Sequence, residues 1–132
     1  MNKTLIVLMH GLGSNGDDLE SLIPYLKPHL PDAEFFSPNG IEPCDLFPYG
    51  YQWFSLQDRA PEAMLKELER TSGAIRNMIE TKAKSLSITL GNVILFGFSQ
   101  GTMTSLYLAL SSEVPYKAVV GFSGSLIMPK QI

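Results

Sequence analysis

Cysteine is nearly absent from this sequence, which has 132 residues and a single thiol, at Cys44. One cysteine excludes an internal disulfide and a zinc site made of cysteines alone. The two histidines, His10 and His29, lie far apart along the chain and indicate no metal site. No apolar run approaches the roughly 18 residues that a transmembrane helix needs. These scarcities predict a cytoplasmic domain that folds without disulfides, uses no metal or organic cofactor, and does not insert stably into a membrane.

Charge of either sign is also scarce, at 17% of residues, and 13 acidic against 10 basic side chains leave a net charge of −3. A mildly negative surface does not attract polyanions, so nucleic acids and anionic membranes are excluded as main partners. Hydrophobic residues, by contrast, make up 45% of the chain. A folded chain of this length buries about two-thirds of its unfolded surface, so residues 1–132 are expected to form a single domain with one core.

Short apolar runs alternate with segments of helical periodicity. Because the runs are continuously apolar, they indicate strands that are buried on both faces, as in a parallel sheet. Apolar residues at helical spacing between the runs predict covering helices. The expected strands span residues 4–9, 34–37, 92–96 and 117–122, and the expected helices lie within 17–26, 61–82 and 102–111. The alternation predicts an α/β fold, in which a mainly parallel sheet of about four strands is flanked by helices.

The segment from residue 39 to residue 58 follows neither period. It contains several aromatic side chains, namely Phe47, Tyr49, Tyr51, Trp53 and Phe54. Long ordered loops often carry function, so this segment is expected either to form a wall of a site or simply to pack over the core.

A glycine-flanked serine follows the strand expected at 92–96. The motif Gly97-Phe98-Ser99-Gln100-Gly101 places Ser99 between that strand and a helix. Glycines on both sides let strand and helix approach closely, and a helix N-terminus favours negative charge that develops nearby. The pattern predicts a nucleophile elbow that exposes the Ser99 hydroxyl. The simpler alternative is a glycine-rich turn in which the serine only caps the helix.

A second glycine-rich turn, His10-Gly11-Leu12-Gly13, follows the strand expected at 4–9. An acyl-transfer serine needs backbone N–H donors for the oxyanion, and the residue after the nucleophile, Gln100, supplies one. The carboxyl ends of parallel strands share one edge of the sheet, so the amide of Leu12 is expected to supply the other. Alternatively, these glycines only end a strand, but that leaves the pairing of this turn with Ser99 unexplained.

Three segments together, residues 8–19, 50–55 and 97–101, resemble the carboxylesterase/phospholipase family of small α/β-hydrolases, which includes the acyl-protein thioesterases. The resemblance implies a serine esterase that cleaves small carboxylic esters or thioesters through an acyl-Ser99 intermediate. It implies backbone oxyanion donors at Leu12 and Gln100. It further implies that Trp53 lines the acyl site and contacts the substrate.

No aspartate or histidine follows Ser99, and the only acidic residue there is Glu113, at the far end of the expected helix. The family order is serine, acid, histidine, so we expect a C-terminally truncated α/β-hydrolase domain. His10 belongs to the oxyanion turn and His29 to a helix end, so neither is expected to act as the base. A serine without a base stays protonated and is a poor nucleophile. The chain is therefore expected to be inactive or very weakly active.

Three interpretations remain open. The chain is competent only when another chain supplies the C-terminal half, or it is a non-catalytic domain with only binding capacity, or it is a fragment of an intact enzyme. In the strand order that the resemblance implies, 34–37, 4–9, 92–96 and 117–122, the last strand is an apolar edge. Exposed apolar edges pair with other chains, so a homo-oligomer or a complementing C-terminal chain is expected to use residues 117–122.

Overall fold

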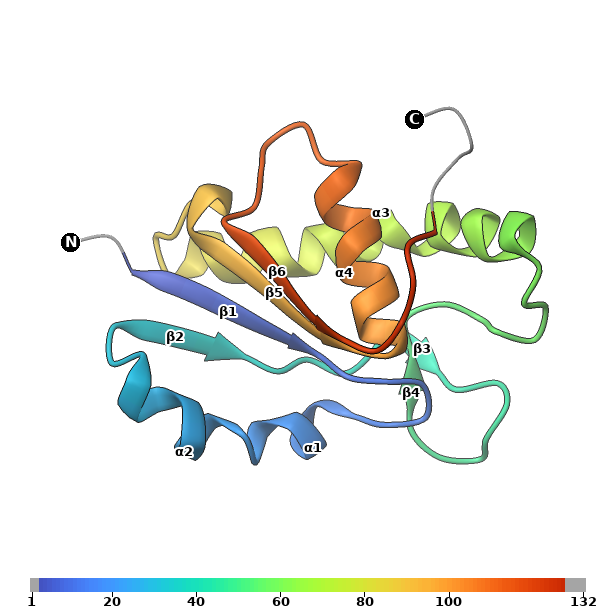
Figure 1. The fold of residues 1–132 in the computed structure, drawn as a ribbon, viewed down its shortest axis with the longest axis horizontal. Helices are drawn as coiled ribbons and strands as arrows, with labels where there is room; N and C mark the ends of the chain where they lie inside the picture. Colours follow the sequence, from blue (N-terminus) through green and yellow to red (C-terminus); the bar gives the residue numbers. More distant parts are fainter. Residues whose placement is uncertain (1–2, 128–132) are drawn as a thin grey trace.

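The computed structural model describes residues 3–127, and its centre is a four-stranded parallel sheet (Figure 1). The strands are β1 (Thr4–Met9), β2 (Ala33–Phe36), β5 (Val93–Phe98) and β6 (Ala118–Phe122). They lie in the order β2-β1-β5-β6, and each neighbouring pair is parallel. The structure thus confirms the α/β class, the parallel sheet and the strand order expected from the sequence.

Helices lie on both sides of this sheet. The helices α1 (Gly16–Glu20) and α2 (Ile23–Leu26) and the 3-10 helix η1 (Lys27–His29) connect β1 to β2. The helix α3 (Pro61–Ser85) and the 3-10 helix η2 (Leu90–Asn92) precede β5, and α4 (Gln100–Leu110) connects β5 to β6. Figure 1 shows α1 and α2 on one side of the sheet and α3 and α4 on the other.

One expected helix is divided into two. The apolar spacing over residues 17–26 predicted one helix that Pro24 either permits or shortens, but α1 ends at Glu20 and α2 begins at Ile23. Proline has no N–H to donate and is tolerated only in the first helical turn. Pro24 occupies that turn of α2, so it starts a second helix and cannot continue the first.

The larger part of the core lies between the sheet and α3 with α4. Successive residues of a strand point to opposite faces, and Leu5, Val7 and Met9 of β1 all belong to this core. From α3, Leu68 and Ile75 reach it at a spacing of about two helical turns. The amphipathic helix expected from residue 61 onward is therefore confirmed. It carries charged residues on its other face, and no helix within residues 3–127 is long and apolar enough to cross a membrane.

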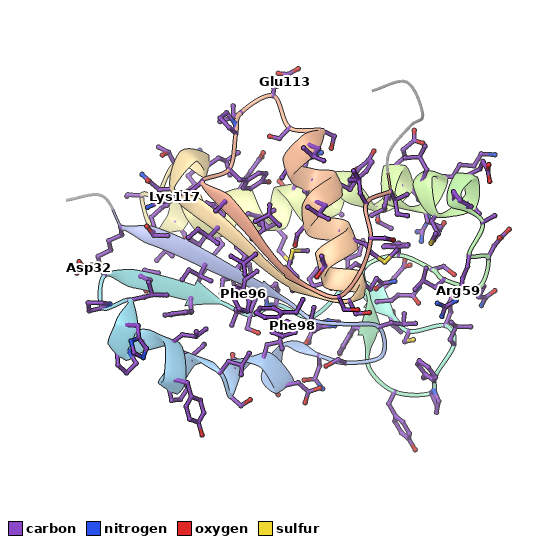
Figure 2. The ribbon with its side chains drawn as sticks, viewed as in Figure 1. Asp32, Arg59, Phe96, Phe98, Glu113 and Lys117 are labelled. Atoms are coloured by element: carbon purple, nitrogen blue, oxygen red, sulfur yellow. The ribbon has the colours of Figure 1, made fainter. Side chains whose placement is uncertain are left out.

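The opposite face of the sheet is covered only in part. The helices α1 and α2 pack on Ile6 and Leu8 of β1, and the half-buried Phe96 of β5 packs against the same cluster. Phe96, Phe98 and Phe122 contact one another with ring centroids 5.2–5.5 Å apart, and Phe122 is 52% exposed. Figure 2 labels Phe96 and Phe98 on this face.

The aromatic-rich segment after residue 39 contains a small antiparallel pair, β3 (Glu42–Pro43) with β4 (Tyr51–Gln52). The sequence did not predict it, because two-residue strands are too short to show a period. β4 also joins the turn after β1, since Gly13 N–H donates to Tyr51 O at 2.9 Å and Tyr51 N–H donates to Ser14 O at 2.8 Å. The segment is thereby fixed against the turn that carries Leu12.

Candidate active site

Ser99 is the single residue between β5 and α4, and its backbone is strained. Its φ of 53° and ψ of −110° lie in a region that residues with a side chain rarely adopt. Its N–H donates to Phe122 O at 2.8 Å, and its carbonyl accepts from the N–H groups of Thr102 and Met103 at 3.0 and 3.1 Å. These bonds hold the strand–turn–helix geometry of a nucleophile elbow.

The glycines that flank Ser99 allow α4 to lie directly against the sheet. A Cβ atom at Gly101 would lie 2.0 Å from Met9 O, and one at Gly97 would lie 2.5 Å from the backbone nitrogen of Thr102. Backbone atoms cannot yield by such distances, so any side chain at Gly97 or Gly101 would push α4 away from β1 or β5. The motif's spacing therefore has a direct steric cause.

The turn after β1 lies beside Ser99. Met9 and Gly97 are register partners, so both turns leave the sheet at the same edge. A Cβ atom built on Gly11 would lie 3.6 Å from Ser99 Cβ. Among residues 3–127, the backbone N–H groups of Leu12 and Gln100 donate to no protein acceptor. Both predicted oxyanion donors are thus available, and their role in binding an oxyanion stays a prediction.

His10 is fully buried and both of its ring nitrogens are engaged. Nε2 accepts the Gly40 N–H at 2.7 Å, so it carries no proton, and Nδ1 then donates to Gly11 O at 2.7 Å. Burial lowers the pKa of His10 below its ordinary value of 6.5. The imidazole is therefore neutral near pH 7 and has no free lone pair with which to accept the Ser99 proton.

Trp53 lies beneath the same turn with no exposed surface. Its indole N–H donates to His10 O at 2.8 Å, and its ring packs on the His10 ring with centroids 5.1 Å apart. Trp53 thus packs against the turn from the side of the hydrophobic core. Its expected contact with the substrate stays a prediction.

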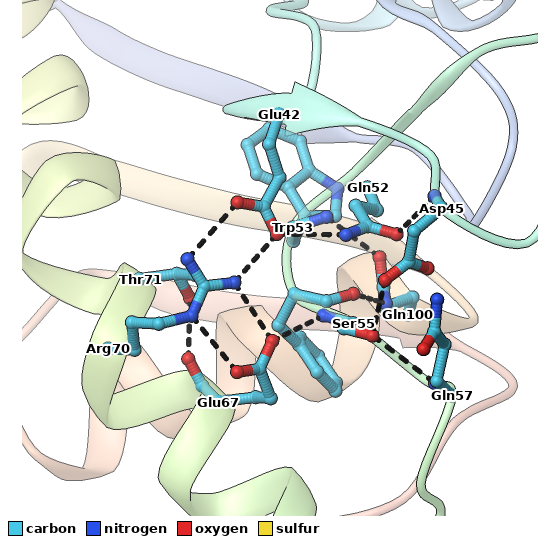
Figure 3. Close-up of polar contacts among 11 residues, drawn as sticks. Glu42, Asp45, Gln52, Trp53, Ser55, Gln57, Glu67, Arg70, Thr71 and Gln100 are labelled. Atoms are coloured by element: carbon cyan, nitrogen blue, oxygen red, sulfur yellow. Dashed lines mark hydrogen bonds and ion pairs between the residues drawn. The ribbon is translucent and has the colours of Figure 1, made fainter.

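The side chain of Gln100 has a role that sequence reasoning missed. Figure 3 shows its carboxamide pairing with the backbone of the 51–54 segment. Oε1 accepts the Trp53 N–H at 2.8 Å, and Nε2 donates to Phe54 O at 2.6 Å. Only a backbone role had been expected for Gln100. The available signal was a long polar side chain at the start of an apolar, buried helix, because buried amides need partners.

An ion network fixes the same segment to α3. Arg70 of α3 contacts Glu42 at 2.8 Å and Glu67 at 2.9 Å, and Glu67 also accepts the Ser55 N–H at 2.9 Å (Figure 3). The pKa of Glu67 is lowered, chiefly by its hydrogen bond with Arg70. Arg70 is about half exposed, so each pair contributes modestly, about 0–1 kcal/mol. The network orients the segment more than it stabilises the fold.

The remaining candidates for acid and base lie elsewhere. Glu113 follows the C-terminal end of α4, whereas Ser99 immediately precedes its first residue, and Figure 2 shows Glu113 at the tip of a distant loop. His29 belongs to η1 and, with Asp32 and Lys117, lines a surface cavity where β2 and β6 begin. The elbow lies at the opposite edge of the sheet, where the strands end. Within the described part of the chain, no group of three His, Cys, Asp or Glu residues is placed to hold a metal ion.

Comparisons with known proteins agree with this geometry. Residues 1–132 match the family model for phospholipases and carboxylesterases. The chain is 27% identical over 122 residues to esterase YpfH from Escherichia coli K12, and 26% identical over 130 residues to acyl-protein thioesterase 1 from Schizosaccharomyces pombe. Each alignment includes 92% of this chain but only 52% and 55% of those relatives, so the chain spans about half their length.

The solved structures give the same result. The crystal structure of esterase PE8 matches with a TM-score of 0.90 and 34% identity, over 98% of this chain and 61% of that chain. A carboxylesterase from Mesorhizobium loti matches at 18% identity with a TM-score of 0.76, which supports the fold. The resemblance inferred from the three motifs is thus confirmed, and the chain belongs to the phospholipase/carboxylesterase family.

Proposed function

We propose that this chain carries the nucleophile and the oxyanion site of a serine hydrolase that acts on carboxylic esters or thioesters. The observation that supports this most directly is the strained backbone of Ser99 at the β5–α4 turn, beside Gly11. Strain of this kind is concentrated at functional sites, where the surrounding contacts hold it in place. The names of the relatives, an esterase and an acyl-protein thioesterase, indicate the substrate class.

In the proposed reaction, Ser99 Oγ attacks the carbonyl carbon, and the carbonyl oxygen becomes an oxyanion that accepts hydrogen bonds from the Leu12 and Gln100 amides. The N-terminus of α4 adds a favourable dipole. The C–O or C–S bond then breaks, the alcohol or thiol leaves with the proton that Ser99 lost, and an acyl-Ser99 ester remains. Water hydrolyses this ester to the free acid and restores the hydroxyl.

The transfer of the Ser99 proton to a base is the step of this reaction for which the chain offers the least. No aspartate or histidine follows Ser99 in the sequence, and both nitrogens of His10 are engaged. Loss of the base can lower turnover on the order of 10⁶-fold and leave roughly 10³–10⁴-fold over water from the oxyanion site. We therefore propose that residues 1–132 form one domain with the first part of the hydrolase fold, and that these residues alone have very weak or no activity.

The second candidate function is a non-catalytic domain that only binds a ligand or a partner. The engagement of both His10 nitrogens favours it, because His10 then has no free lone pair for the Ser99 proton. Under either function, we propose that β6 pairs with a second copy or with a complementing chain. Its edge is unpaired within the described sheet, and Val120 and Phe122 are 38% and 52% exposed. A cytoplasmic location remains a proposal that rests on the scarcity of cysteine.

A fluorophosphonate probe with mass-spectrometric mapping tests the nucleophile. Slow labelling at Ser99, abolished by Ser99→Ala, is expected. Ser123→Ala is the matched control, because Ser123 also follows a Gly-Phe pair and also has a positive φ. Absence of labelling in the folded chain would favour the non-catalytic function. Labelling as fast as that of the full-length Escherichia coli esterase would contradict the missing base.

A further inference from the structure

We propose that residues 51–54 form a brace between the two predicted oxyanion donors, and that the carboxamide of Gln100 is the positioning group that holds it. The inference rests on the proposed function for its catalytic consequence. The brace itself is defined by contacts that can be tested without any reaction.

One end of the brace is held by the residue next to the nucleophile. The Gln100 carboxamide accepts the N–H of Trp53 at 2.8 Å and donates to the carbonyl of Phe54 at 2.6 Å. Both bonds are buried, and Gln100 is only 1% exposed. An unmade bond at either site would leave a buried backbone group without a partner. The pairing requires an acceptor and a donor on one planar group, which an amide or a neutral carboxylic acid provides.

The other end of the brace contacts the turn on both sides of Leu12. Before Leu12, the Trp53 indole donates to His10 O at 2.8 Å. After Leu12, Tyr51 O accepts the Gly13 N–H at 2.9 Å. These bonds fix the His10–Gly11 and Leu12–Gly13 peptides. The Gly11–Leu12 peptide, which carries the Leu12 N–H, lies between them and has little freedom to rotate. The brace therefore sets the direction of the Leu12 N–H together with two bonds inside the turn, in which Gly11 O accepts from His10 Nδ1 and from the Ser14 N–H.

The backbone is closely packed against its neighbours along the brace. A Cβ atom at Gly50 would lie 2.1 Å from Gly13 O, and one at Gly40 would lie 2.5 Å from Gln52 O. The backbone thus contacts the turn directly just before the brace, and the backbone at Gly40 contacts the brace itself at Gln52. A displacement of Trp53 is transmitted to the turn through its indole bond to His10 O and through the backbone bond between Tyr51 O and the Gly13 N–H.

Amide hydrogen exchange tests the mechanical part of the proposal. Gln100→Met removes both hydrogen bonds at nearly constant volume, and Gln57→Met makes the same chemical change at an exposed position. We expect exchange of the Trp53 and Gly13 amides to accelerate about tenfold or more in Gln100→Met, because local opening becomes easier. Amides of β1 and β5 should keep the rates seen in Gln57→Met. Uniform acceleration through the sheet, or an unchanged Gly13 amide, would overturn the proposal.

A pH profile tests the positioning role. The neutral acid of Gln100→Glu can accept from Trp53 and donate to Phe54, whereas the ionised carboxylate cannot donate and would repel the Phe54 carbonyl. Fluorophosphonate labelling of Ser99, divided by that of the unmodified chain at each pH, should therefore fall about tenfold as pH rises through the Glu pKa, which burial raises. Gln100→Met should be slow at every pH, and a flat Gln100→Glu ratio contradicts the role.

The exchange and labelling experiments together distinguish a failure of this inference from a failure of the proposed function. If Ser99 of the unmodified chain does not label, the proposed catalytic function fails, and the exchange experiment still decides whether the brace exists. If Ser99 labels but Gln100→Met labels as fast as Gln57→Met, the nucleophile stands and the positioning role is wrong.

Discussion

The strain at Ser99 makes a quantitative prediction about stability. A residue with a side chain held in such a region costs about 1–3 kcal/mol, and glycine avoids that cost. Glycine also loses roughly 0.5–1 kcal/mol through the entropy of the unfolded chain. The Ser99 side chain makes no capping hydrogen bond to α4 that its removal would break. Ser99→Gly should therefore raise the free energy of unfolding by about 1 kcal/mol, while it abolishes labelling.

Urea unfolding at one fixed protein concentration measures this change. Ser99→Ala is the matched control, because alanine also lacks the hydroxyl but keeps the Cβ atom and hence the strain. The free energy of unfolding is expected to be higher for Ser99→Gly than for Ser99→Ala, and in thermal unfolding this difference corresponds to a rise in Tm of about 3–5 °C for a chain of this size. Equal midpoints for the two variants would refute the claim that the elbow stores backbone strain.

Three further outcomes follow from particular contacts. Gly101→Ala should destabilise the fold by about 1–3 kcal/mol or more in urea unfolding, because its Cβ would lie 2.0 Å from Met9 O, whereas Gly91→Ala, which meets no atom within 4 Å, should be nearly neutral. Val120→Lys should shift light scattering toward the monomer, and an unmodified chain that is already monomeric would contradict association through β6. His10 has a lowered pKa, so its unfolded form binds protons more readily. The contribution of neutral His10 to the free energy of unfolding is thus fully present above about pH 6.5 and is lost as pH falls below it. In His10→Gln the urea midpoints should therefore change less across that pH range.

The sequence predicted the sheet well, because continuous apolar runs such as Leu5 to Met9 have few other uses in a chain of this length. It also predicted that Ser99 and the turn at Gly11 lie at one edge, since both follow parallel strands. The division at Pro24 was visible but not decisive, because proline is compatible with the start of a helix as well as with its end.

The contacts within the candidate site could not be predicted in the same way. Gln100 and Trp53 are 47 residues apart, and no local pattern specifies that an amide side chain will meet one particular peptide. The strands β3 and β4 are two residues long and have no period to detect. The burial of Trp53 behind the turn depends on its bond to the His10 carbonyl, which is a product of tertiary packing.

Backbone strain of the kind found at Ser99 persists only where the surroundings determine the conformation more than once. Here the N–H of Ser99 is fixed by β6, its carbonyl is fixed by α4, and Gly101 brings α4 against β1. Each of these contacts, and the brace that orients Leu12, is made by residues within 3–127. The geometry of the predicted nucleophile and of the predicted oxyanion turn is therefore set by contacts within the described part of the chain. Proton transfer is not set by those contacts, because the acid and histidine follow the serine in the family order. The geometry around Ser99 can thus be present without the base. We expect such a chain to have an ordered elbow and to label slowly at Ser99.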